Sequence, residues 1–163
     1  MTRNIDRTCC FTGHRMISKE NKIFVAEKTY EICEELIKAG YTDFIAGGAL
    51  GFDTIAAQCV LKLREKYEKV KLILALPCKN QCKGWKSADV EIYEEISKKA
   101  DEIIYVSEEY YPDCMKKRNR FMVDESSVCI AYLTRMSGGT AYTVTYAVEQ
   151  GKKIIFVKFQ KKG

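Results

Sequence analysis

Short apolar runs rich in β-forming residues alternate with longer helical patterns along the chain. We predict strands over six segments, 7–12, 42–46, 70–76, 102–106, 127–133 and 153–157. Helices are predicted between them, over about 19–39, 53–67, 87–100, 113–125 and 140–150. Parallel strands need long crossover connections, which helices of this length supply. The alternation therefore predicts an α/β fold, a doubly wound, mainly parallel sheet of about six strands with helices on both faces.

Composition agrees with one folded domain over residues 1–163. The chain is 47% hydrophobic and 30% charged, with only two prolines, so it can bury a substantial core. No apolar run approaches the ~20 residues of a membrane helix, and the first ten residues lack the apolar stretch of a secretory signal. We therefore expect a cytoplasmic protein with no membrane contact.

The formal net charge is +5, which permits an anionic ligand. A nucleic-acid surface usually carries a concentrated basic stripe, and none stands out in the sequence, so we do not favour a nucleic-acid partner.

Eight cysteines are an unusual number for such a chain. Most lie inside apolar runs, where a thiol behaves as a small hydrophobe, so we expect reduced cysteines rather than disulfides. Cys78 and Cys82 form a C-x3-C pair, but structural zinc needs four ligands and the only histidine, His14, is distant in sequence. We predict no metal site, and a redox role for this pair stays open.

Polar and glycine-rich segments follow the predicted strands. In a parallel sheet, ligands bind outside the carboxyl ends of the strands. The candidate site residues at that edge are Gly13, His14, Arg15, Gly47, Gly48, Gly51, Asp53, Ser137, Gly138, Gly139 and Thr140, with Arg118 and Asn119 from the helix before the fifth strand. Two glycine turns that lead into helices offer free backbone N–H groups and a positive dipole end, which suit phosphate.

Each candidate has a plainer interpretation. Glycines 47, 48 and 51 could simply permit a tight turn, and Asp53 and Thr140 stand where helix N-caps are expected. Arg15 and Arg118 could bind phosphate through two hydrogen bonds each. For His14, between a glycine and an arginine at a strand end, we favour binding over a surface role. The single tryptophan, Trp85, is more typical of packing than of base stacking.

Several common motifs are absent. The turn after the first predicted strand is not G-x-G-x-x-G, there is no G-x4-G-K-[ST] phosphate loop, and no G-x-S-x-G nucleophile turn occurs. With one histidine, H-E-x-x-H metal-hydrolase motifs are also excluded. The sequence therefore does not match a standard dinucleotide dehydrogenase, a P-loop enzyme or an α/β-hydrolase.

Five segments, in order, resemble one known group. They are residues 11–15 (FTGHR), 47–53 (GGALGFD), Gln81 with Trp85, 118–124 (RNRFMVD) and 137–140 (SGGT) followed by Ala147. Together they resemble the YpsA-like branch of the SLOG superfamily, which joins the DNA-processing protein DprA (SMF) and the cytokinin-activating LOG enzymes. The resemblance implies a Rossmann-like fold that binds nucleotides or their derivatives at the glycine-rich strand ends, in a bacterial protein.

The departures from the LOG pattern bear on activity. The LOG signature P-G-G-x-G-T-x-x-E has an upstream arginine, matched here by Arg118, but Thr143 stands where the glutamate is expected. Glu149 lies too far along the helix to replace it. If the chain is an enzyme, Arg118 and Asp53 are the catalytic candidates.

Three functions therefore stay open. The first is a binding module, without a cofactor, for a nucleotide-derived small molecule such as an ADP-ribose or NAD relative, which could act as a sensor or regulator. The second is a LOG-like nucleoside 5′-monophosphate phosphoribohydrolase. The third is single-stranded DNA binding, as in DprA relatives. A homodimer is compatible with the resemblance.

Overall fold

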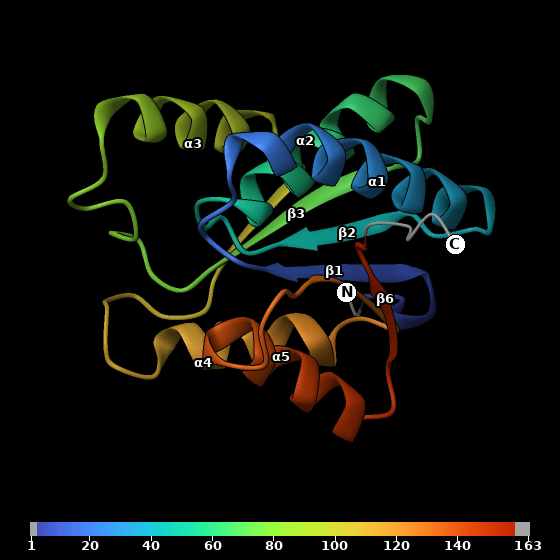
Figure 1. The fold of residues 1–163 in the computed structure, drawn as a ribbon. Coiled ribbons are helices and arrows are strands. Elements are labelled where there is room, and N and C mark those ends of the chain that lie inside the picture. The colour runs from blue at the N-terminus through green and yellow to red at the C-terminus, as the bar shows by residue number, and fades with distance from the viewer. Residues whose placement is uncertain (1–2, 159–163) are drawn as a thin grey trace.

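The computed structural model describes residues 3–158 and shows a six-stranded sheet between two layers of helices (Figure 1). The strands are β1 (Thr8–Gly13), β2 (Asp43–Ala46), β3 (Lys71–Leu76), β4 (Glu102–Tyr105), β5 (Val128–Tyr132) and β6 (Lys153–Phe156). The helices are α1 (Lys19–Lys38), α2 (Phe52–Lys66), α3 (Ser87–Lys99), α4 (Cys114–Asp124) and α5 (Gly138–Glu149). The predicted elements are confirmed, with ends shifted by one or two residues. A short 3-10 helix over Ile5–Arg7 was not predicted.

The strand order is β4-β3-β2-β1-β5-β6, and each neighbouring pair is parallel. This confirms the α/β, Rossmann-like fold. Helices α1, α2 and α3 cover one face of the sheet, and α4 and α5 cover the other (Figure 1). From β1, the sheet is extended on one side by β2, β3 and β4 and on the other side by β5 and β6. The strand order therefore reverses between β1 and β5, and ligands are expected at the carboxyl ends of these two strands.

The sheet is buried on both faces, which explains why its strands are apolar nearly throughout. On β1, Cys9 and Phe11 join the core beneath α1 and α2, whereas Cys10 joins the smaller core beneath α4 and α5. The same alternation divides β3, where Leu74 faces the first core and Ile73 the second. The central strands are therefore packed from both sides.

Ser18 is the N-cap residue of α1, and its side chain makes no capping hydrogen bond. Glycines follow the ends of α1 and α5. Gly40, after α1, has φ +106°, and Gly151, after α5, has φ +73°, which is the left-handed conformation that ends helices. A Cβ added at either glycine would meet no atom within 4 Å, so the backbone conformation alone explains these two glycines.

All eight cysteines are free, and seven of them are buried. Burial raises the pKa of the Cys9 thiol, and it raises that of Cys59 to about 11. Such thiols stay protonated and pack as small hydrophobes. Within residues 3–158, no group of three or more histidine, cysteine, aspartate or glutamate side chains is arranged to hold a metal ion.

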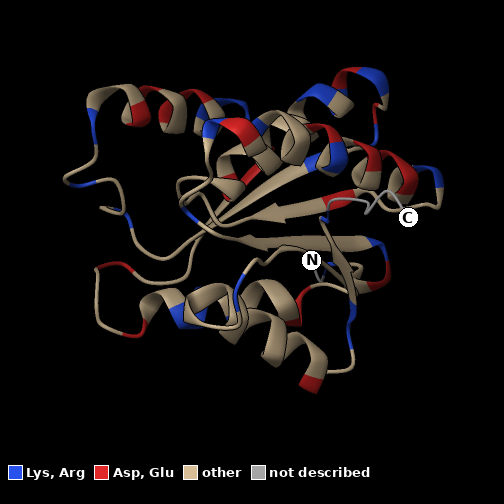
Figure 2. Cartoon of the chain, viewed as in Figure 1, with Lys and Arg blue, Asp and Glu red and all other residues tan. Residues whose placement is uncertain are grey.

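Basic and acidic residues are interspersed along α1, whereas α3 carries acidic residues followed by two lysines in its last turn (Figure 2). Helix α5 carries no charged residue before Glu149. Across the described part of the chain, no helix is both long enough and apolar enough to cross a membrane.

Candidate functional site

A cleft of about 550 Å³ opens at the carboxyl ends of β1 and β5. Its walls come from the β1–α1 connection, from α4 and from the start of α5. Ten of the thirteen candidate site residues line it, namely Gly13, His14, Arg15, Asp53, Arg118, Asn119, Ser137, Gly138, Gly139 and Thr140. Gly47, Gly48 and Gly51 do not line this cleft. The structure thus brings most of the predicted site together.

The first glycine turn, between β2 and α2, is packed against the protein itself. Gly51 has φ +79°, and a Cβ there would lie 2.2 Å from the carbonyl oxygen of Arg15. The N–H of Ala49 donates to Asp53 Oδ2 at 3.1 Å, and the N–H of Phe52 donates to the His14 carbonyl at 3.1 Å. These contacts support the plainer interpretation, in which the glycines permit a close approach of two chain segments.

The second glycine turn, at the start of α5, is open. Gly138 has φ +87°, and added Cβ atoms at Gly138 and Gly139 would meet no atom within 4 Å. Ser137 is the N-cap residue, but its side chain makes no capping hydrogen bond, and the first turn holds no acidic residue. The φ of Gly138 requires glycine there, as at Gly40 and Gly151, whereas neither backbone conformation nor packing requires glycine at Gly139. An anion at this helix N-terminus would gain from the amides that no side chain caps.

The expected N-cap positions of Asp53 and Thr140 were wrong. Gly51 is the N-cap residue of α2 and Ser137 that of α5, so both side chains lie within the first turn of their helices. The reason for the Asp53 error is that the chain enters α2 through the left-handed glycine, so the helix begins before the residue that a side-chain cap would have occupied.

Two buried side chains of opposite charge, Arg118 and Asp53, lie at the floor of the cleft. Arg118 Nη1 donates to the carbonyl oxygens of Gly47 and Ala75, the latter at 3.4 Å, and its Nε donates to Asn119 Oδ1 at 2.8 Å. A Cβ on Gly47 would lie 2.8 Å from both Arg118 Nη1 and Asp53 Oδ2. The guanidinium thus joins α4 to the ends of β2 and β3, and two of its nitrogens already have partners before any phosphate arrives.

The ionisation of this pair is perturbed by burial. Burial raises the pKa of Asp53 to about 6, although the charge of Arg118, the Ala49 N–H and the charge of Arg15 all act in the opposite direction. Burial likewise lowers the pKa of Arg118, against the attraction of Asp53. The carboxyl group is therefore poised between its charged and neutral forms near neutral pH.

The charged residues that line the cleft are mainly cationic. Arg15, Lys116 and Arg135 are exposed on its walls, and Arg118 lies at its floor. Asp53 is the only carboxylate among its lining residues. Together with the open N-terminus of α5, this charge distribution favours an anionic ligand.

One known protein family matches nearly the whole chain. Residues 10–161 match the model of the YspA SLOG family. The chain belongs to this family. The assignment confirms the resemblance to the YpsA-like branch, and it covers nearly all of the chain, the cleft included.

One relative in sequence and two solved structures are similar to this SLOG protein. The chain is 37% identical over 134 residues to the uncharacterized SPbeta prophage-derived protein YoqJ of Bacillus subtilis, covering 74% of this chain and 78% of YoqJ. The structure of DprA from Streptococcus pneumoniae superposes with a TM-score of 0.67 at 16% identity, covering 96% of this chain and 52% of that one. DprA from Helicobacter pylori, studied for its single-stranded DNA binding mode, gives 0.67 at 18% identity, with 95% and 66% covered. At these identities the DprA structures establish the shared fold.

His14 of this SLOG protein is hydrogen-bonded to the β5–α5 connection, which leads into the open turn. Its ring is buried, and Nε2 accepts a hydrogen bond from the N–H of Thr134 at 2.8 Å. An accepting nitrogen carries no proton, so the ring is neutral with its proton on Nδ1. Burial, and next the charge of Arg135, lower the pKa of His14 in agreement with this state. The histidine therefore fixes the β5–α5 connection to the end of β1.

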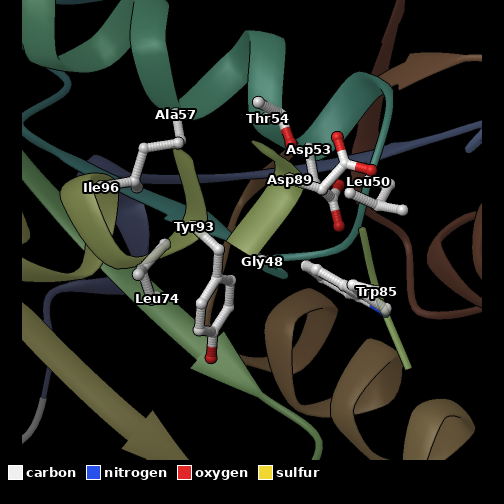
Figure 3. Close-up of a pocket in the computed structure, with 10 residues that line it drawn as sticks. All are labelled: Gly48, Leu50, Asp53, Thr54, Ala57, Leu74, Trp85, Asp89, Tyr93 and Ile96. Atoms are coloured by element: carbon white, nitrogen blue, oxygen red, sulfur yellow. The ribbon is translucent and has the colours of Figure 1, made fainter. Parts of the chain in front are cut away.

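A second, much smaller cavity lies on the other side of Asp53, between α2 and α3 (Figure 3). Its volume of about 10 Å³ is room for one water molecule rather than a ligand. Trp85 packs edge-to-face on Tyr93 at 5.5 Å, and Gln81 Nε2 donates to the Gly48 carbonyl at 2.9 Å. The expected packing role of Trp85 is thus confirmed, and Gln81 supports the first glycine turn.

Sequence reasoning missed several residues of the cleft. Met16, Tyr110, Met115, Lys116 and Arg135 line it without belonging to any predicted motif. All of them lie in connections that follow a strand, or in the helix turn directly after one. The rule that ligands bind at the carboxyl ends of strands could have found them.

Proposed function

We propose that this SLOG protein binds a phosphate-bearing, nucleotide-derived small molecule, such as an ADP-ribose or NAD relative, in the cleft. The phosphate would lie at the N-terminus of α5, and Arg15 and Arg135 would neutralise it from the walls. The N-terminus of α5 carries this proposal, because its first residues line the cleft together with Arg15 and Arg135, and an added Cβ at Gly139 would meet no atom within 4 Å. The volume of about 550 Å³ lies in the range of roughly 300–1,000 Å³ that small-molecule sites occupy.

The residues of the cleft support binding more than LOG-like hydrolysis. Thr143, at the position of the LOG glutamate, is buried and donates to the Gly139 carbonyl at 2.9 Å. It offers no charge to an oxocarbenium-like transition state. Glu149 is exposed at the far end of α5 and does not line the cleft.

Hydrolysis stays as the second candidate because of one observation. Asp53 lines the cleft with its pKa raised to about 6, a value that suits a general acid or base near neutral pH. In that function Asp53 would supply the proton to the departing base, and the charge of Arg118 would favour the ionised carboxylate that remains.

The fold similarity to DprA makes single-stranded DNA the third candidate. The cations of the cleft form a local group rather than a stripe, and charges on α1 and α3 are mixed (Figure 2). A DNA groove needs a basic surface that follows the strand over several nucleotides. These features favour the small molecule.

The test is a calorimetric titration with AMP, ADP-ribose and NAD, and with a labelled single-stranded oligonucleotide over a range of salt concentrations. Saturable binding of a small nucleotide supports the proposal. Binding of the oligonucleotide alone, falling steeply with salt, would replace it with DNA binding. Chromatography of the mixtures for free base identifies hydrolysis. If no compound binds, the proposal fails.

A pair of matched variants locates the site. Gly139→Leu adds bulk at the second position of α5, where a Cβ meets nothing within 4 Å, so the fold should tolerate it. Ala88→Leu makes the same kind of change at the second position of α3, which is exposed and outside the cleft. Loss of binding in Gly139→Leu but not in Ala88→Leu, with both melting temperatures near that of the wild type, would place the ligand at α5.

A further inference from the structure

Three of the four methionines within residues 3–158 line the cleft. Met16, Met115 and Met122 line it, and Met136 directly precedes the turn that begins at Ser137. Met122 is buried, whereas Met16 is 88% exposed and Met136 is 77% exposed. Burial in the core therefore explains Met122 but not Met16, which is exposed and lines the cleft.

Tyr110 adds an aromatic ring, and we define the apolar rim of the cleft as Met16, Tyr110 and Met115. Tyr110 is 61% exposed and lines the cleft from the β4–α4 connection. Ten large apolar side chains are exposed in the described part of the chain, and three of them line this cleft. Exposed apolar side chains that gather at one opening mark a binding surface rather than the scattered exposure normal for proteins.

The rim and the cationic residues occupy one cleft but differ in chemistry. The open turn of α5, Arg15 and Arg135 suit phosphate, whereas the rim offers a phenol ring and flexible, polarisable thioethers. Thioethers make favourable contacts with aromatic rings, and tyrosine stacks on nucleobases of any kind. A ligand that satisfies both parts has an anionic end and a planar aromatic end.

We infer that the rim is a nucleobase subsite, in which the base of the ligand stacks on Tyr110 between the thioethers of Met16 and Met115. The inference rests on the proposed phosphate site at α5. It adds that an aromatic base is a required part of the ligand, so that sugar phosphates alone would bind more weakly than nucleotides.

Methyl signals of the methionines test this directly. Protein labelled with ¹³C in the methionine methyl groups is titrated with AMP and, separately, with ribose 5-phosphate, and Met→Leu variants assign the signals. We expect AMP to move the signals of Met16 or Met115 upfield through the ring current of the base, and ribose 5-phosphate to leave them nearly unmoved. Saturating AMP without a ring-current displacement would overturn the inference and leave the phosphate site intact. If neither compound binds, the proposed function fails and the base subsite with it.

Variants of the tyrosine give an independent measurement. Tyr110→Ala should weaken AMP binding about tenfold, as expected for loss of one stacking ring, and leave ribose 5-phosphate binding unchanged. Tyr110→Phe, which keeps the ring, should restore AMP affinity. Tyr105→Ala is the control, because this tyrosine is 44% exposed on β4 and does not line the cleft. Equal effects of Tyr110→Ala on both compounds would refute a base contact.

Discussion

Neutralising the buried carboxylate of Asp53 should stabilise the protein at neutral pH, even though Arg118 lies close by. Burial raises the pKa of Asp53 from its ordinary value of 3.8 to about 6. The folded state therefore binds the proton more tightly than the unfolded chain. The contribution of Asp53 to stability is full below pH 4 and is lost as the pH rises through about 6.

The size of the effect follows from the two pKa values. Each pKa unit corresponds to about 1.4 kcal/mol, so the ionised carboxylate costs about 3 kcal/mol above pH 6. The substitution Asp53→Asn would imitate the protonated form, because an amide oxygen can still accept the hydrogen bond from the Ala49 N–H. The pKa of about 6 for Asp53 already includes the attraction between its ionised form and Arg118, so the figure of about 3 kcal/mol needs no separate correction for that attraction.

The assay is thermal and urea unfolding of wild type and Asp53→Asn between pH 4 and pH 7.5. The two proteins should have similar stability at pH 4 and diverge as the pH rises. At pH 7.5 the variant should melt roughly 6–12 °C higher, as about 3 kcal/mol implies for a chain of this size. Asp113→Asn, at the exposed N-cap of α4 where the side chain makes no capping bond, is the control and should change little. A variant that is less stable than the wild type at pH 7.5 would show that the Arg118 attraction outweighs burial.

Three further outcomes are expected. Gly51→Ala should lower the urea-unfolding free energy by more than about 3 kcal/mol, because its Cβ would lie 2.2 Å from the Arg15 carbonyl at a φ of +79°; a smaller loss would contradict the packing role of that turn. His14→Ala should destabilise the protein more at pH 8 than at pH 5, since burial lowers the pKa of His14 and its acceptor bond to Thr134 is lost as the pH falls through that value; equal losses in urea unfolding at both pH values would refute it. Thr143→Glu should destabilise by several kcal/mol and release no base from AMP by chromatography, because that position is 3% exposed; a stable, hydrolytic variant would contradict this.

The fold could be predicted because each element carries its own local signal. Segment 70–76 is apolar nearly throughout, and in the structure β3 is covered on both faces. Glycines mark the ends of α1 and α5. The order of the strands has no such local signal, because apolar runs do not specify their neighbours. The 3-10 helix over Ile5–Arg7 is too short to show a period at all.

The two glycine turns show where sequence reasoning about the site stops. Gly51 and Gly139 both stand beside a helix start, and the sequence assigns phosphate binding to both turns equally. What separates them is the chain segment opposite, the carbonyl of Arg15 in one case and open space in the other. That contact joins segments 36 residues apart, and the bond from Arg118 to the Gly47 carbonyl spans 71. Periodicity and spacing carry no information on such contacts.

The two ends of the cleft differ in rigidity, and this decides where ligand specificity should arise. The floor is held by hydrogen bonds from Arg118 to β3 and to the end of β2, and the β5–α5 connection is fixed by the bond from Thr134 to His14. The rim consists of exposed methionines with three rotatable bonds each and one exposed tyrosine. A preorganised floor should bind the phosphate of every ligand in the same place, because its groups have little freedom to adapt. Differences in affinity within a series of nucleotides that share one phosphate group should therefore follow the base and disappear in Tyr110→Ala, whereas Gly139→Leu should weaken the whole series alike.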